Sequence, residues 1–351
     1  MPFRFTLRRA GPALLIAAAL LTGCAEPPKA IAAPPPPPPV APVVTLSPQV
    51  IELASAYRHY MIRTTAITPD FVDGEAVARS VQTSAAYEPG QLVKGAIAYA
   101  AVVALQDKTF VDGVRVYAMD PTQRRQIAYE ILKDPAYAAG IAGSASAAGL
   151  VIANLGGDAQ RLYDGGKAVK QSAYDIQRQP WSKADVPARD VRLAAAKSVS
   201  VAAMTGDIAE TTRLQQASMG IPAAAVSVTP VAPPYSPTVI RGLAIAALAV
   251  LGEAGDTNLN SVMGLMAEPN IGRCMASSKL NLYQCLAVAR PHYEDVFCLG
   301  QHAMMDTGRC VIRAAGLSEP YEARFIPDAS SINKGMGKKP DVRKPTPRKK
   351  G

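Results

Sequence analysis

Residues 274–310 read CMASSKLNLYQCLAVARPHYEDVFCLGQHAMMDTGRC and hold four of the five cysteines of the chain. Cys274 and Cys285 are eleven residues apart, about three helical turns, so they share one face of a helix. Arg290-Pro291 interrupts that helix, because a residue before proline is disfavoured in the α region. The remaining cysteines follow on a second helical segment. The stretch therefore predicts a helical hairpin.

Four cysteines allow three disulfide pairings. An antiparallel hairpin joins the inner pair, Cys285–Cys298, and the outer pair, Cys274–Cys310. The alternative joins sequence neighbours, Cys274 to Cys285 and Cys298 to Cys310, and requires each segment to fold back on itself. The antiparallel pairing resembles the twin-cysteine helical hairpin scaffold in spacing, a likeness from which we transfer no function. Clustered cysteines of even number are typical of disulfides in an exported chain.

Outside the hairpin, apolar residues recur at the i, i+3, i+4, i+7 spacing of amphipathic helices. In the first such segment Val50, Leu53, Ala54, Tyr57 and Met61 share one face. Strand-like alternation is scarce. The chain is predicted to be all-α, as an irregular multi-helix bundle or as two helical subdomains, with the disulfide-linked hairpin at the C-terminal end.

Several helices are expected to begin with an N-cap residue followed by proline, which needs no N–H donor at the first helical position. The pairs are Ser47-Pro48, Asp120-Pro121, Asp134-Pro135 and Ser236-Pro237. Residues 96–105 and 243–251 are strongly apolar but only about ten residues long, too short to cross a bilayer, so we expect buried core helices. Core filling is also expected of Met263, Met266, Met304 and Met305.

Proline-rich residues 222–236 divide the helical part into residues 47–221 and residues 237–326. This segment is either a linker between two helical subdomains or a long surface loop within one domain. We interpret Gly143-Ser144-Ala145-Ser146 as a loop between helices. Gly156-Gly157 and Gly165-Gly166 fit helix termini better than a phosphate-binding loop, since no GKS/T follows.

The N-terminus has the three parts of a secretory signal peptide. Arg4, Arg8 and Arg9 precede an apolar run over residues 13–21, and the run ends at Leu21-Thr22-Gly23-Cys24. This last sequence resembles the lipobox of bacterial lipoproteins.

The resemblance covers residues 1–25 and implies that residues 1–23 are removed and that Cys24 receives a diacylglycerol and usually an N-acyl chain. Two or three acyl chains are sufficient for stable membrane anchoring. Ala25 follows where aspartate usually favours inner-membrane retention in that class. We therefore expect a lipoprotein of the outer membrane that faces the periplasm.

Residues 24–46 are predicted to be a lipid-anchored linker. Six consecutive prolines, Pro34 to Pro39, favour extended polyproline II, and the proline-rich part spans about 50 Å. A role as a ligand for aromatic grooves is the alternative.

Positive charge is concentrated at the C-terminal end. Three of the 37 basic residues lie in residues 1–23 and eight lie in residues 334–351, beside one of the 28 acidic residues, so elsewhere 26 basic residues face 27 acidic ones. Residues 327–351 are predicted to be a disordered basic tail. Its expected partners are anionic lipid, lipopolysaccharide or an acidic protein. Nucleic acid is not expected, because the chain is predicted to be exported.

The candidates for metal binding lie in one stretch and are Cys298, His302, Asp306, Cys310 and His292. An oxidising compartment favours disulfides, and CxxC and HExxH spacings are absent. No metal and no other cofactor is predicted. His59 is interpreted as a surface residue or one whose hydrogen bonds are satisfied.

Two functions follow from these features. The first is a membrane-anchored lipoprotein of the cell envelope that serves as a helical interaction or assembly module. The alternative is a periplasmic enzyme acting on a cell-envelope polymer, which would need a buried acid glutamate in a cleft. No catalytic residue is predicted, because the candidates lie in amphipathic contexts typical of solvated faces. These are Glu52, Glu130, Glu253 and Glu294.

Overall fold

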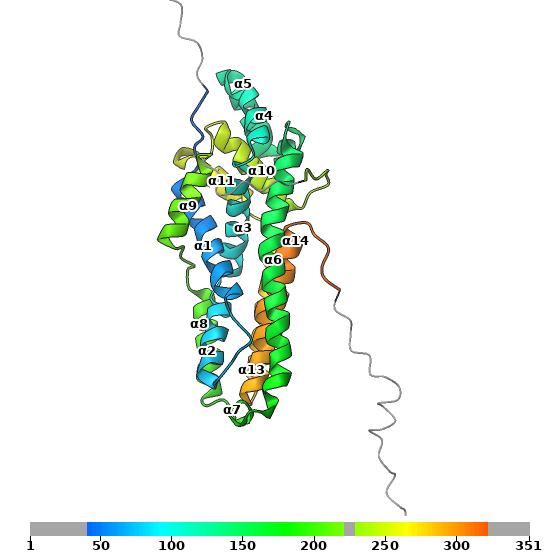
Figure 1. The fold of residues 1–351 in the computed structure, drawn as a ribbon. Coiled ribbons are helices and arrows are strands. Elements are labelled where there is room, and N and C mark those ends of the chain that lie inside the picture. Colours follow the sequence, from blue (N-terminus) through cyan, green and yellow to red (C-terminus); the bar gives the residue numbers. More distant parts are fainter. Residues whose placement is uncertain (1–40, 221–228, 322–351) are drawn as a thin grey trace, which may run out of the picture. The chain divides into compact units, whose positions relative to one another are not determined.

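The computed structural model describes residues 41–220 and 229–321. The described helices all belong to one compact unit. Within these two ranges the chain has no strand and only two isolated bridges, Leu46 with Ala254 and Asp185 with Pro291. The prediction of an all-α fold is confirmed (Figure 1).

The helices follow one another along the chain. They are α1 (Pro48–Thr65), α2 (Gly74–Ala85), α3 (Pro89–Ala104), α4 (Lys108–Ala118), α5 (Pro121–Lys133), η1 (Pro135–Gly140), α6 (Ser144–Asp175), η2 (Ile176–Arg178), α7 (Pro180–Lys183), α8 (Arg189–Val201), α9 (Ile208–Ser218), α10 (Pro237–Val250), η3 (Asp256–Asn258), α11 (Leu259–Leu265), α12 (Pro269–Val288), α13 (His292–Cys298), η4 (Leu299–Met305) and α14 (Asp306–Ala314). The first three η segments are 3-10 helices and η4 is a π-helix.

Proline at the first position sets the start of several helices, as predicted. The side chains of Ser47, Asp120, Asp134 and Ser236 each accept a hydrogen bond from a backbone N–H of the turn that follows. Asp134 caps the 3-10 helix η1 rather than an α-helix. α3 and α12 use the same device with a glutamate cap, from Glu88 and Glu268.

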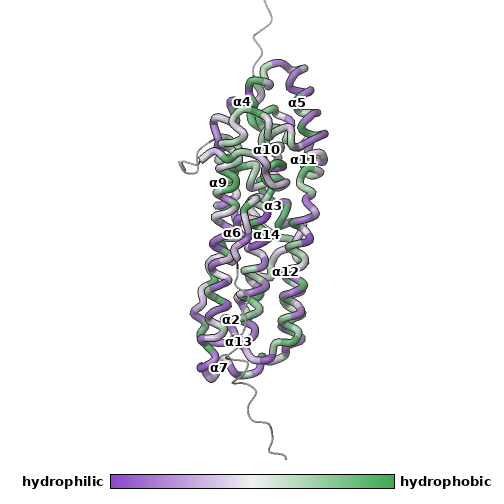
Figure 2. The backbone as a smooth tube through the Cα atoms, turned by 90° about the vertical axis from the view of Figure 1, so that its right-hand side faces the viewer, coloured by the Kyte–Doolittle hydropathy of each residue, from purple (hydrophilic) through white to green (hydrophobic). Residues whose placement is uncertain are grey.

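The core is built around the two apolar helices α3 and α10. α3 contacts both α1 and α10, and nearly all of the apolar side chains of α3 and α10 are buried. The helices before residue 221 and after residue 228 therefore share one hydrophobic core. In Figure 2 the longer helices α6 and α12 show hydrophobic and hydrophilic residues in turn along the tube, as expected for helices that cover such a core. Among the described residues, no helix combines the length and apolarity needed to cross a membrane.

α6 corrects two interpretations of the sequence. It runs unbroken for 32 residues, so both glycine pairs lie inside the helix and Ser144 to Ser146 form its first turn rather than a loop. Only Gly143, with a positive φ of 83°, remains outside as the N-cap. Gly166 is needed for close packing, and Gly156 leaves room for a leucine side chain. A β-carbon on Gly166 would stand 2.7 Å from the backbone nitrogen of Met305, and one on Gly156 would stand 2.5 Å from the side chain of Leu317.

The C-terminal hairpin has the predicted antiparallel form. α12 forms one arm of the hairpin. The other arm is a continuous helical segment made of α13, η4 and α14. Disulfides join Cys274 to Cys310 and Cys285 to Cys298, with Cα–Cα distances of 5.7 and 5.6 Å. The pairing is therefore inner with inner and outer with outer, not neighbour with neighbour. The sequence did not predict the π-helical stretch η4, which lies between Cys298 and Cys310.

Candidate functional site

Some of the predicted residues lie outside the described part of the chain. These are Cys24 with the whole N-terminal signal region, most of the proline-rich linker, and the whole basic tail. Residues 229–236 of the internal proline-rich segment are described and are not helical.

The side chains that were candidates for metal binding contact other groups in the structure. Cys298 and Cys310 are held in the two disulfides. His302 Nδ1 lies 2.9 Å from an oxygen of Asp306. His292 packs against Trp181, with 6.2 Å between the ring centroids. Within residues 41–220 and 229–321 no group of three potential ligands comes together.

The four candidate glutamates do not share a cleft, and none is fully buried. Glu52 is exposed, Glu130 lies within 4.0 Å of Lys133, Glu253 accepts a hydrogen bond from Asn258, and Glu294 accepts one from the backbone of Arg290. The carboxylates buried in the described body are instead Asp158, Glu268 and Asp295, which sequence analysis had not singled out.

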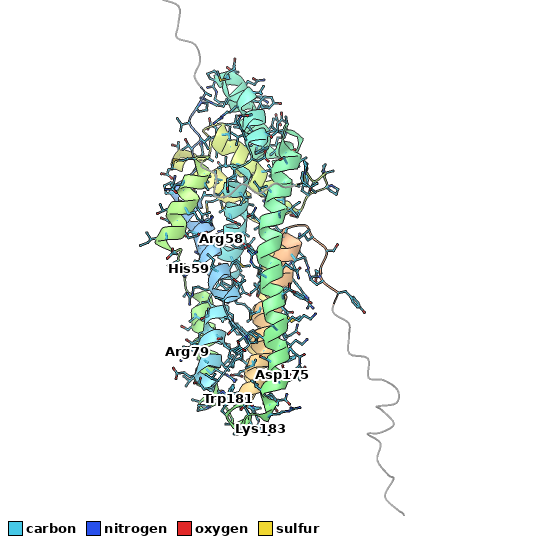
Figure 3. The ribbon with its side chains drawn as sticks, in the orientation of Figure 1. Arg58, His59, Arg79, Asp175, Trp181 and Lys183 are labelled. Atoms are coloured by element: carbon cyan, nitrogen blue, oxygen red, sulfur yellow. A yellow bond between two sulfur atoms is a disulfide. The ribbon has the colours of Figure 1, made fainter. Side chains whose placement is uncertain are left out.

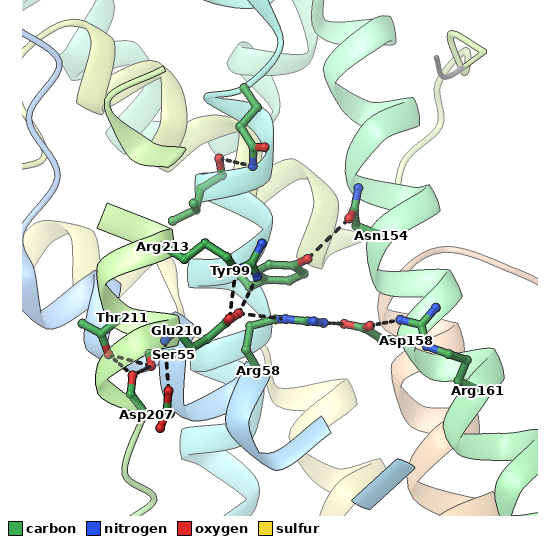
Figure 4. A network of polar contacts seen from close by, with 12 residues as sticks. Ser55, Arg58, Tyr99, Asn154, Asp158, Arg161, Asp207, Glu210, Thr211 and Arg213 are labelled. Carbon is green, nitrogen blue, oxygen red and sulfur yellow. Dashed lines mark hydrogen bonds and ion pairs between the residues drawn. The ribbon is translucent and has the colours of Figure 1, made fainter. Parts of the chain in front are cut away.

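Arg58 of α1 is the centre of a charged network that links three helices (Figure 4). Its guanidinium donates to Asp158 of α6 and, at 3.2 Å, to Glu210 of α9. Arg161 contacts the other oxygen of Asp158, and Arg213 lies 2.5 Å from Glu210. Although partial burial opposes it, the hydrogen bond and charge of Arg213, together with Arg58, lower the pKa of Glu210. Each acid in the network is neutralised, so the network ties helices together and presents no free acid.

A second buried ion pair lies near the end of the hairpin where α12 connects to α13. Arg192 of α8 donates to Asp295 of α13 and to the carbonyl oxygen of Leu286 in α12. The two side chains are 7% and 2% exposed. Burial raises the pKa of Asp295 to about 6, against the opposing effect of Arg192. The pair holds α8 against both arms of the hairpin.

Lys279 of α12 is buried and pairs with no carboxylate of the described residues. Its Nζ donates to the carbonyl oxygen of Ala85 at 2.5 Å and lies 3.8 Å from the ring centroid of Tyr87. Burial lowers the pKa of Lys279 to about 7. The adjacent Ser278 bonds different groups, the carbonyl oxygen of His302 at 2.7 Å and the hydroxyl of Thr307 at 2.9 Å. Ser278 and Lys279 are therefore not arranged as a nucleophile and its base.

The pKa of Lys279 predicts a specific pH dependence of stability. In the unfolded chain this lysine has a pKa near 10.5, so between about pH 7 and 10.5 the unfolded state binds the extra proton, and the contribution of Lys279 to stability rises with pH. Lys279→Met is expected to raise the free energy of unfolding at pH 7 by about 3–5 kcal/mol. This gain should shrink as the pH approaches 10.

Urea unfolding of wild type and Lys279→Met at several pH values measures this difference. The exposed Lys183 supplies the matched control, because Lys183→Met should leave the stability unchanged across the same range. A difference between wild type and Lys279→Met that stays constant from pH 7 to 10 would show that Lys279 does not titrate as described.

An open groove in the described part of the chain carries basic side chains that pair with no buried carboxylate. It lies between α1, α2 and the end of α8 with the segment that follows, and has a volume of about 450 Å³. We call it the basic groove, because His59 and Arg63 of α1 and Arg79 of α2 line it and no carboxylate does. The i, i+4 spacing of His59 and Arg63 was visible in the sequence, but their meeting with α2 and α8 was not. His59, interpreted from the sequence as a surface or satisfied residue, is half-buried in this lining.

Comparison of the chain with family models, with curated proteins and with solved structures gave no match.

Proposed function

We propose that the chain is a lipid-anchored lipoprotein of the cell envelope whose helical body is a non-catalytic binding and assembly module. Lipid on Cys24 would attach it to the outer membrane, with the body in the periplasm. The lipobox-like sequence Leu21-Thr22-Gly23-Cys24 and the signal-peptide features before it support this anchor. The basic tail would contact anionic lipid, lipopolysaccharide or an acidic partner protein.

The observation that carries the proposal is the oxidised state of the body. All four cysteines after Cys24 are paired in two disulfides. Disulfides form and persist in exported proteins and are rare in the cytosol. The structure of the body and the leader sequence, which are independent of each other, therefore favour the same compartment.

The placement of the acids favours binding over catalysis. Asp158 and Asp295 are neutralised by arginines, and the buried carboxylate of Glu268 caps α12 by accepting two backbone hydrogen bonds. A glycosidase-like acid has to face substrate from a cleft, with a free proton to give. The basic groove, in contrast, is built from groups that recognise charge.

The anchor is tested by replacing its lipid acceptor. Cys24→Ala is expected to leave the chain unlipidated and to move it from the membrane fraction to the soluble fraction. Thr22→Ser is the matched control, since it keeps a small residue in the lipobox and should leave the protein in the membrane. Membranes should be washed in high salt, because the basic tail by itself binds anionic surfaces through interactions that salt screens. Full retention of Cys24→Ala after this wash would refute the anchor.

A further inference from the structure

The basic groove has the dimensions and composition of a small-molecule site. Its volume of about 450 Å³ lies in the range of ligand pockets, about 300–1,000 Å³. Ala86 and Val199 provide apolar contact surface beside the largely buried Tyr60, and Gln82 and Thr83 add polar side chains. The hydroxyl of Tyr60 donates to the carbonyl oxygen of Ser84 at 3.1 Å, so it contributes its ring rather than a free polar group.

Among the described residues, no buried carboxylate pairs with the basic side chains of the groove. Within the described residues neither His59 nor Arg63 forms an ion pair. Arg79 pairs with Glu75 one turn earlier on α2, but the two side chains are 62% and 80% exposed, and such pairs contribute little. The neighbouring Arg58 shows the opposite case, because it turns into the body and meets two carboxylates. Figure 3 shows where Arg58 and His59 lie on α1 and where Arg79 lies on α2.

Two arginines and a histidine, supplied by two helices, suit a group with several oxygens and more than one negative charge. Guanidinium groups bind phosphate through paired, charge-assisted hydrogen bonds. A phosphate on an organic body would place its oxygens at Arg63 and Arg79 and its carbon skeleton on the surface formed by Ala86 and Val199. We propose that the basic groove is a binding site for a phosphate group carried by a small organic molecule or by a lipid.

This inference rests on the proposed binding role of the body but not on the lipid anchor. The loss of membrane attachment in Cys24→Ala and the loss of phosphate binding in groove variants are separate results. Failure of either one leaves the other standing.

The test is isothermal titration of the full-length chain, purified in detergent, with defined probes. The probes are glucose 6-phosphate, short-chain phosphatidic acid below its micelle concentration and inorganic phosphate, with glucose and short-chain phosphatidylcholine as the partners that lack an exposed phosphate monoester. Binding of glucose 6-phosphate alone would identify a soluble ligand, and binding of phosphatidic acid alone a lipid. Tighter binding of either one than of inorganic phosphate is expected, because the apolar surface adds contact.

Matched variants separate the groove from the basic tail, which every variant retains. Arg63→Gln with Arg79→Gln should weaken binding by about 10- to 100-fold, the loss of two charge-assisted contacts. Arg115→Gln with Arg125→Gln, which removes two exposed arginines from α4 and α5, should leave it unchanged. Gln82→Glu adds a carboxylate at an exposed lining position and should also weaken binding at no cost to the fold. The proposal is overturned if no phosphate probe binds at millimolar concentration, or if the groove variants bind as tightly as wild type.

Discussion

Removing the outer disulfide by Cys274→Ser with Cys310→Ser is expected to lower the free energy of unfolding by about 4 kcal/mol, and removing the inner one by about 3 kcal/mol. The bonds close sequence separations of 36 and 13 residues, and the longer loop restricts the unfolded chain more. Because one loop lies within the other, we expect the four-cysteine variant to lose less than the sum. Guanidinium unfolding of the three variants and wild type measures these differences.

Labelling of free thiols is the control for the starting state. No body cysteine of the folded wild type should react before reduction. An unfolding midpoint that does not move when either pair is removed would contradict the role given to these bonds.

Replacing Asp295 by alanine is expected to cost about 3–5 kcal/mol at pH 8, because Arg192 is left as a buried charge without its partner. Its remaining bond to the carbonyl oxygen of Leu286 satisfies only part of the guanidinium. At this pH the carboxylate is ionised, since its pKa is raised only to about 6. Urea unfolding of the variant against wild type provides the measurement.

The double variant Arg192→Met with Asp295→Leu distinguishes the lost charge balance from lost packing. With both charges replaced by apolar groups, most of the stability should return. A double variant that is as unstable as Asp295→Ala would mean that the ion pair acts through shape and not through charge.

Much of the fold was predictable because it is set by local chemistry. A cap residue before proline fixes a helix start whatever surrounds it, so the starts at Ser47, Asp120 and Ser236 were found. Cysteines spaced by helical turns on both sides of Arg290-Pro291 likewise predicted a helical hairpin, and the structure decided between its two candidate pairings.

The interpretation failed where long-range packing decides the structure. Glycine usually weakens a helix, but Gly166 of α6 lets η4 approach the helix backbone, and the η4 residues that it meets lie more than 100 residues away in the sequence. The charged sites were hidden for the same reason. Nothing near Arg58 or Lys279 in the sequence shows that one meets Asp158 and Glu210 and the other meets Ala85. The basic groove needs three separate helices and appears only when they are assembled.

The central proposal is that a lipid on one sulfur atom holds this disulfide-linked helical body at a membrane outside the cytoplasm. Mass spectrometry of the N-terminal peptide of the native protein tests it most directly. We predict a peptide that begins at Cys24 and carries diacylglycerol on its sulfur. A peptide that still contains residues 1–23, or an N-terminus at another position with no fatty acid attached, would contradict the proposal.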